Sequence, residues 1–466
     1  MNTLHMAGQL ALSRIRNARG HALLDALAVL AFSVSSWLLL TTAGGVWMFY
    51  QRLHTLVPRL AEQGIPERTT EGLADVYMSL AVLALGLLII PLLSLGASAA
   101  RLGANGRARR LASLRLIGLS AGQVNLMTLV ETLIQGAVGF AIGGAIYLLS
   151  LPAWSNMSFT TLPITTGEML LPWWGWLAAA ALVALITIGS TLAGLWRVSI
   201  SPLGVSRRET PKALRYWRGI GVVVALPVLG LMMNRLDPST SGTANFVMSA
   251  LMLMIFFLMV SLAGPLFIQI AARPAAHTAR VPRLLGTRRV LDDPRAAWRN
   301  VSAISLMSLL ASVVVFIMPF DVSHFEGADP DVVTLSRTLT GDVTKGVAIA
   351  LAFALILGAT GTLIHQASDV FDRADESAAL TRIGLPYSTL LRARMWQVIP
   401  PLLLMLTVTI SLGALLGEAA QQETNADNLI ILAWVVILGV ILTLAAVAST
   451  APIQAMVSSQ KTRKND

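Results

Sequence analysis

The sequence predicts an all-α integral membrane protein, and two observations carry that prediction. Only 12% of the 466 residues are charged and 55% are hydrophobic, with a mean hydropathy of +0.71, whereas a soluble protein carries about 25% charged residues. The apolar residues also come in blocks close to the ~20 residues that an α-helix needs to cross a bilayer. This composition excludes a soluble enzyme, a disordered chain and a coiled coil.

The apolar blocks predict about ten transmembrane helices. The first block is too long for a cleaved signal peptide and lacks a small-residue cleavage site, so we expect a retained span. The fifth is the weakest because it is short and contains Pro227. The predicted spans are 23–50, 77–100, 125–150, 172–196, 219–234, 245–272, 301–320, 345–366, 396–417 and 428–450.

The basic residues orient these spans. With the N-terminus placed in the cytoplasm, 28 of the 34 Lys and Arg residues fall on the inner side, which is the bias expected of cytoplasmic loops. We therefore expect a multi-pass protein of the bacterial plasma membrane with both termini cytoplasmic. The same bias explains the net charge of +10, and no nucleic-acid partner is expected because no aromatic–basic motif accompanies the charge.

The outer side is mildly acidic in this arrangement. The gap between the seventh and eighth spans is about 24 residues long, too short for a domain, and is expected to be an acidic loop. A solvated loop is the simpler interpretation and a vestibule for a cationic ligand is the alternative. Its acidic residues are Asp321, Glu326, Asp329, Asp331 and Asp342.

A short repeat divides the chain. Arg110–Leu119 follows the second span and Glu376–Leu385 follows the eighth, and both end in Ile-Gly-Leu. We call them the first and second repeated segments. Chance similarity of apolar sequence does not explain why both lie between the second and third spans of a four-span block. The repeat predicts two parallel four-span units joined by a two-span linker, a 4+2+4 arrangement with domains at 1–215, 216–273 and 274–466.

The repeated segments have apolar residues at helical spacing. Such a helix can lie on the anionic inner leaflet, or it can serve as a docking element, which its occurrence at two equivalent places favours. The Gly-Leu ending suits a helix C-terminus followed by a tight turn into the next span.

The pattern Leu-Arg-Leu-Ile-Gly-Leu at 114–119, followed by Glu131 early in the next span, resembles the FtsX-like permease family. Residues 285–299 are similar to the actinobacterial branch. The family includes permeases of MacB-type and Bce-type ABC transporters, and the 4+2+4 plan is similar to the Bce type, in which one polypeptide supplies both halves. In that family the segment after the second span contacts the ATPase.

The resemblance implies cytoplasmic ABC ATPase subunits as partners, two per permease, with ATP and Mg²⁺ bound on those subunits and no cofactor on this chain. Membrane lipids are the other expected partner. The second segment has Thr381 in place of Arg115 and follows acidic residues, so the two docking surfaces are expected to differ. The implied docking residues are Arg110, Leu114, Arg115, Ile117, Gly118, Leu119, Leu380, Arg382, Ile383, Gly384 and Leu385.

The sequence offers few candidates for chemistry. Leu119–Gln123 looks like an ATPase signature loop, but the chain has no Gly-x4-Gly-Lys-Ser/Thr phosphate loop, so the ATPase is expected on a separate chain. The histidines have no close metal-ligand spacing. Glu131 is a coupling or gate candidate because a carboxylate in a membrane segment is costly. The alternative is that it pairs with an arginine near the inner interface.

Two patterns concern packing within the membrane. Gly139 and Gly143 form a small-xxx-small pattern in the third span, which is typical of closely packed membrane helices. Trp173, Trp174 and Trp176 open the fourth span at its outer end, where an aromatic belt is expected.

Together these features predict a non-catalytic permease subunit. It would couple ATP hydrolysis by separate ATPase subunits to export or extraction of a hydrophobic or amphipathic substrate, such as a lipid or an antimicrobial peptide. The alternative is an FtsX-type mechanotransmitter that regulates an outer cell-wall partner without transport. An ion-coupled transporter would need several buried ionisable groups, and Glu131 is the main candidate.

Overall fold

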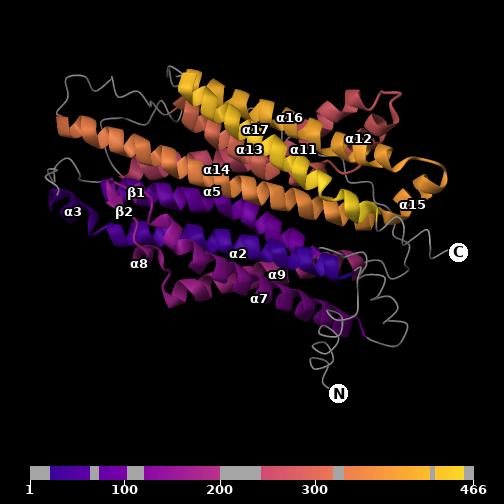
Figure 1. Cartoon of the computed structure of the whole chain (residues 1–466), viewed down its shortest axis with the longest axis horizontal. Coiled ribbons are helices and arrows are strands. Elements are labelled where there is room, and N and C mark those ends of the chain that lie inside the picture. The colour runs from indigo at the N-terminus through magenta and orange to yellow at the C-terminus, as the bar shows by residue number, and fades with distance from the viewer. Residues whose placement is uncertain are drawn as a thin grey trace.

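The computed structural model describes residues 21–62, 73–101, 120–199, 243–317, 330–419 and 426–455, and most of these residues are helical (Figure 1). The all-α class is confirmed in these ranges, where the strands are a two-residue antiparallel pair. The elements are α2 (His21–Arg52), α3 (Leu56–Glu62), α5 (Leu73–Arg101), α7 (Ala121–Trp154), β1 (Ser158–Phe159), β2 (Leu162–Pro163), α8 (Thr166–Met169), α9 (Trp173–Ser199), α11 (Thr243–Ala275), α12 (Val281–Asp292), α13 (Pro294–Ile317), α14 (Pro330–Asp372), α15 (Ala374–Arg382), α16 (Tyr387–Ala419) and α17 (Ala426–Ala448).

Eight of the described helices are long and apolar enough to cross a membrane. They correspond to the predicted spans one to four, six, and eight to ten. α13 covers residues 301–317 of the seventh predicted span as a helix, and the fifth span, 219–234, lies outside the residues that the structure describes. The count of ten spans and the predicted domain limits therefore stay predictions.

The helices pack in two groups. The first block is α2, α5, α7 and α9, in which α2 packs on α5 and α7 while α9 packs on the same two helices. The second block is α13, α14, α16 and α17, in which α13 packs on α14 and α16 while α17 packs on both. The blocks meet where α14 contacts α5 and α2, and α11 contacts α5 and α13. Corresponding helices thus make corresponding contacts in the two blocks.

The two ends of the bundle carry different elements (Figure 1). α3, the β1–β2 hairpin and α8 gather at one end, together with the first turns of α14. The opposite end carries α12 and α15, and α2 begins and α17 ends there. We call these the outer and inner ends after the charge-based prediction. Which end faces the cytoplasm stays a prediction.

Small residues let the first and third helices of each block approach closely. A Cβ on Gly139 of α7 would lie 2.3 Å from Cβ of Phe32 in α2, and one on Gly143 would lie 2.5 Å from the Ser33 carbonyl oxygen. In the second block, a Cβ on Gly413 of α16 would lie 2.1 Å from Oγ of Ser312 in α13. The close packing predicted at Gly139 and Gly143 is confirmed, and it follows the small-residue rule for membrane helices.

One expectation was wrong at the outer end. Residues 321–344 were expected to be a loop; 321–329, with Asp321, Glu326 and Asp329, lie outside the described residues, but α14 begins at Pro330 and runs for 43 residues. Proline suits the first turn of a helix, and Leu335, Leu339 and Val343 recur every four residues, which continues a helical stripe. At 1.5 Å per residue α14 is about 65 Å long, roughly twice the ~30 Å hydrocarbon core. Asp331 and Asp342 therefore belong to a helix.

Candidate functional site

The described half of the predicted docking surface is a short helix at the inner end. α15 follows α14 after a break at Arg373 and ends at Arg382. Gly384 has φ +92°, a left-handed conformation that favours glycine. The Gly384 N–H donates to the Thr381 carbonyl at 3.0 Å, and the Leu385 N–H donates to the Leu380 carbonyl at 3.1 Å. These two bonds are the Schellman ending of a helix, so the predicted C-terminus and turn are confirmed here.

The C-terminal tip of α15 is exposed. Thr381, Arg382 and Gly384 are exposed, and 79% of Ile383 is exposed. This tip therefore presents one large aliphatic side chain to its surroundings, and a single exposed aliphatic residue does not by itself mark an interaction surface. The first repeated segment, with Arg110, Leu114, Arg115, Ile117, Gly118 and Leu119, lies outside the described residues. The docking role itself is untested for both segments.

Ion pairs hold α15 against its neighbours. Glu376 accepts from Arg289 of α12 at 3.1 Å, and Arg289 is buried. Arg373, at the break, contacts Asp369 of α14 at 2.7 Å and Glu376 at 3.5 Å. Burial lowers the pKa of Arg373, but the Asp369 and Glu376 carboxylates outweigh it and raise the pKa above its ordinary value. Arg373 is therefore always charged and fixes α15 to the end of α14.

α12 connects α15 to the membrane helix α16. A Cβ on Gly286 of α12 would lie 2.5 Å from the Ala393 carbonyl oxygen of α16 and 2.7 Å from Cβ of Trp396. The guanidinium of Arg283 lies 5.2 Å from the centre of the Trp396 ring, within range of a cation–π contact. α12 and α16 are thus in close contact, and α12 is tied to α15 by Arg289.

Glu131 lies in α7 of the first block, half-buried, and it takes part in an electrostatic or hydrogen-bonding interaction. One turn later, the Gln135 amide donates to Asp25 of α2 at 2.9 Å. At the matching position of the second block, Gln397 of α16 is buried. The coupling or gate role of Glu131 is untested.

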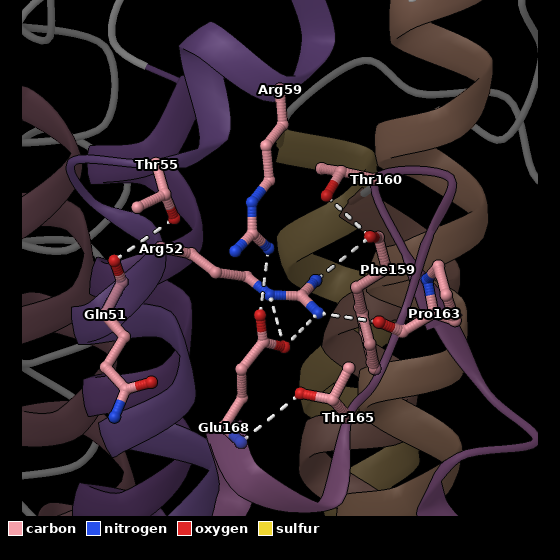
Figure 2. Close-up of polar contacts among 9 residues, drawn as sticks. All are labelled: Gln51, Arg52, Thr55, Arg59, Phe159, Thr160, Pro163, Thr165 and Glu168. Atoms are coloured by element: carbon pink, nitrogen blue, oxygen red, sulfur yellow. Dashed lines mark hydrogen bonds and ion pairs between the residues drawn. The ribbon is translucent and has the colours of Figure 1, made fainter.

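A second polar site lies at the outer end, and sequence analysis missed it (Figure 2). Arg52, the last residue of α2, is only 2% exposed. Its guanidinium donates to the Glu168 carboxylate at 2.7 Å and to the carbonyls of Phe159 and Pro163 at 3.3 Å and 3.0 Å. Arg59 of α3 donates to the other Glu168 oxygen at 2.9 Å. Arg52 thus ties the end of α2 to both strands of the hairpin and to α8.

Glu168 is held in its charged form. Burial raises its pKa, but hydrogen bonds from Arg52 and Arg59 and the charge of Arg52 outweigh burial, so the pKa lies below its ordinary value. Its own N–H donates to the Thr165 hydroxyl at 3.3 Å, which caps α8. One carboxylate therefore organises α2, α3 and α8 at once.

Asp342 of α14 is the third polar centre and is only 3% exposed. One carboxylate oxygen accepts from the Tyr77 hydroxyl of α5 at 2.7 Å and from the Thr160 N–H of the hairpin at 2.5 Å. The other accepts from Lys345 at 2.9 Å, and Lys345 also donates to the Ser158 carbonyl at 2.9 Å. A residue of the second block is thereby bonded to two elements of the first.

Comparison with known proteins places a domain within the first block. Residues 81–203 match the family model of the FtsX-like permease C-terminal domain. This match identifies an FtsX-like permease domain in that part of the chain. No curated protein matches the chain. The match begins in α5, includes the first repeated segment, and covers α7, the hairpin, α8 and α9.

The family and the structure agree on the general character of the protein. An FtsX-like permease domain suggests a membrane permease component of an ABC-type system, and members of this family are non-catalytic membrane subunits. The apolar helices fit a multi-pass protein of the cell membrane. The hairpin that Arg52 and Asp342 contact lies inside the matched region, between α7 and α9.

Proposed function

We propose that this FtsX-like permease couples ATP hydrolysis on separate cytoplasmic ATPase subunits, two per permease, to export or extraction of a hydrophobic or amphipathic substrate. ATP and Mg²⁺ would bind on those subunits. The exposed tip of α15 carries the proposal, because it presents Ile383 at the inner end while ion pairs connect it to α12 and α14. A push on this tip would reach α16 through α12.

The docking part is tested by co-purification with the candidate ABC ATPase. We expect Ile383→Asp to reduce the bound ATPase about tenfold or more, since a charge would enter an apolar contact, a loss of ~1.4 kcal/mol or more. Val281→Asp is the matched control, because Val281 is also a large exposed aliphatic residue at the inner end, on α12. It should leave ATPase binding unchanged.

The first repeated segment is expected to contribute more than the second. Gly118→Trp should therefore abolish co-purification, whereas Gly384→Trp should weaken it, and both proteins should still insert in the membrane. In Gly384→Trp the cause is backbone strain at positive φ, because a Cβ there meets nothing within 4 Å. Full ATPase binding by both variants and by Ile383→Asp would refute docking at these segments and favour helices that lie on the membrane surface.

An apolar substrate class fits the interior of the first block, where a small cavity of about 20 Å³ lies between α2, α5 and α9. Its lining is almost wholly apolar and includes Phe32, Leu39, Leu92, Leu182 and Val183. The cavity is too small for a substrate as it stands, but if these helices moved apart its lining would favour a lipid chain or an amphipathic molecule over a polar solute. ATPase stimulation in liposomes by fluorescent lipid, amphipathic peptide and a polar solute tests this, and stimulation by the polar solute alone would refute it.

A second candidate function is mechanical signalling to an outer cell-wall partner. The observation that favours it is the outer end of the bundle, where α3, the hairpin, α8 and the first turns of α14 lie together (Figure 1). Capture of a cell-wall hydrolase on this surface, with no substrate-stimulated ATPase activity, would support signalling over transport.

A further inference from the structure

Short side-chain hydrogen bonds join the two blocks at the outer end, around Asp342. This carboxylate belongs to α14 of the second block, yet the Tyr77 hydroxyl and the Thr160 N–H, both from the first block, donate to it at 2.7 and 2.5 Å. Lys345, one turn away on α14, donates to the Ser158 carbonyl of the hairpin at 2.9 Å. Hydrogen bonds to a charged acceptor are about twice as strong as neutral ones.

Nearer the inner end of the same helix pair, the described residues make a longer contact. Ser98 of α5 and His365 of α14 lie 3.4 Å apart, a long contact between a hydroxyl and an imidazole. Between the two ends, Phe353 of α14 meets the Trp37 and Trp154 rings of the first block with centroids 6.4 and 6.2 Å apart. Such ring contacts tolerate sliding better than short hydrogen bonds, whose strength depends on distance and angle.

The hairpin that reaches Asp342 is itself fixed to the first block. Arg52 donates to carbonyl oxygens of both strands (Figure 2). The two-residue turn, Thr160–Thr161, has φ of 55° and 63°, a conformation that β-branched residues rarely adopt. The Thr160 N–H that meets Asp342 is presented by this unusual turn. The hairpin thus acts as a rigid part of the first block and cannot simply follow α14.

We propose that Asp342 forms a latch that holds the outer ends of the two blocks together, and that the blocks part at this end only when its bonds to Tyr77 and Thr160 break. The role of this latch in a transport cycle rests on the function proposed above. The latch itself is a property of the chain alone and can be tested without an ATPase.

The test measures the distance between the outer ends. Because the chain has no cysteine, spin labels on His54→Cys and Arg337→Cys report one pair only, and both residues are exposed. In the purified full chain in nanodiscs, we expect one narrow distance distribution. Asp342→Ala should shift it to longer distances and at least double its width. Tyr77→Phe should widen it less, because it removes a single bond and keeps the ring stacked on Phe49 at 5.6 Å.

Asp75→Asn is the matched control, since Asp75 is an exposed carboxylate on α5 two residues before Tyr77. It should reproduce the unmodified distribution. If Asp342→Ala does not fold, Tyr77→Phe alone decides the test. Unchanged distances in the folded latch variants would overturn the proposal, and so would equal widening in Asp75→Asn. Loss of ATPase binding with an intact latch would count against the proposed function and leave the latch standing.

Discussion

At the scale of single residues, Glu168 makes the outer end sensitive to acid. Its folded pKa lies below the ordinary value, so the stability that it contributes is complete above about pH 4.3 and is lost as the pH falls through the lowered value. We expect the melting temperature of the purified protein to fall as the pH is lowered from about 5 to about 3. The melting temperature of Glu168→Gln should be lower at pH 5 and should fall less over the same range. Thermal unfolding across this range measures both.

The burial of Arg52 sets how much stability is lost when the Glu168 carboxylate is removed. Removing one partner of a buried ion pair costs about 3–5 kcal/mol, and Glu168→Leu should approach about 3 kcal/mol because Arg52 keeps two carbonyl acceptors. Glu62→Gln is the control, since Glu62 is exposed at the end of α3. A pH profile of Glu168→Gln that coincides with that of the unmodified protein would contradict this account.

Sequence reasoning succeeds for residues whose role is local. The Schellman ending at Gly384 follows from a glycine placed after a helical stripe, and both were visible in the chain. The ion pair between Arg52 and Glu168 was not visible in the sequence, because 116 positions separate the two residues. Asp342 was assigned to an acidic loop on the basis of composition. Only the spacing of the apolar residues in the sequence distinguishes such a loop from a helix that extends beyond the membrane. The hairpin turn at Thr160–Thr161 could not be predicted, because such two-residue turns are usually signalled by Asn-Gly and this one has two threonines.

At the scale of elements, the α2–α7 contact depends on a missing side chain. Gly139→Leu would place a branched group where even a Cβ lies 2.3 Å from Phe32. Overpacking costs about 1–3 kcal/mol in ordinary cores, and we expect about 3 kcal/mol or more here because the backbone of α2 is also in contact. Resistance to unfolding in detergent measures the loss.

Gly189→Leu in α9 is the control for Gly139→Leu. A Cβ on Gly189 meets nothing within 4 Å, and leucine is the better helix former. This variant should be as stable as the unmodified protein or slightly more stable. Equal stability of the two variants would mean that α2 and α7 do not pack as described.

Element boundaries were predictable where apolar runs define them. Spans one to four, six, and eight to ten reappear as helices, because burial in lipid demands continuous hydrophobicity. The ends were less predictable, since α14 continues well beyond its apolar run on both sides. Polar turns of a helix outside the membrane leave no hydropathy signal, and only their periodicity reveals them.

At the scale of the whole molecule, the charge map gives a direct test of orientation. Asn156 and Ser388 are exposed at opposite ends of the bundle, after α7 and at the start of α16. In intact cells, an impermeant thiol reagent should label Asn156→Cys and should label Ser388→Cys only after the membrane is opened. The unmodified chain, which has no cysteine, supplies the blank. The reverse pattern would invert the topology.

The length of α14 has a mechanical consequence for the whole molecule. The helix joins α15 at the inner end to Asp342 at the outer end, and about 45 Å separate these points at 1.5 Å per residue. As a stiff lever, a tilt of roughly 5° about its midpoint would move each end by about 2 Å. Hydrogen bonds of 2.5 and 2.7 Å at Asp342 do not survive that displacement. A small rotation of α14 imposed at α15 would therefore break the hydrogen bonds of Asp342 at the opposite end of the helix. A force on the hairpin would likewise displace α15.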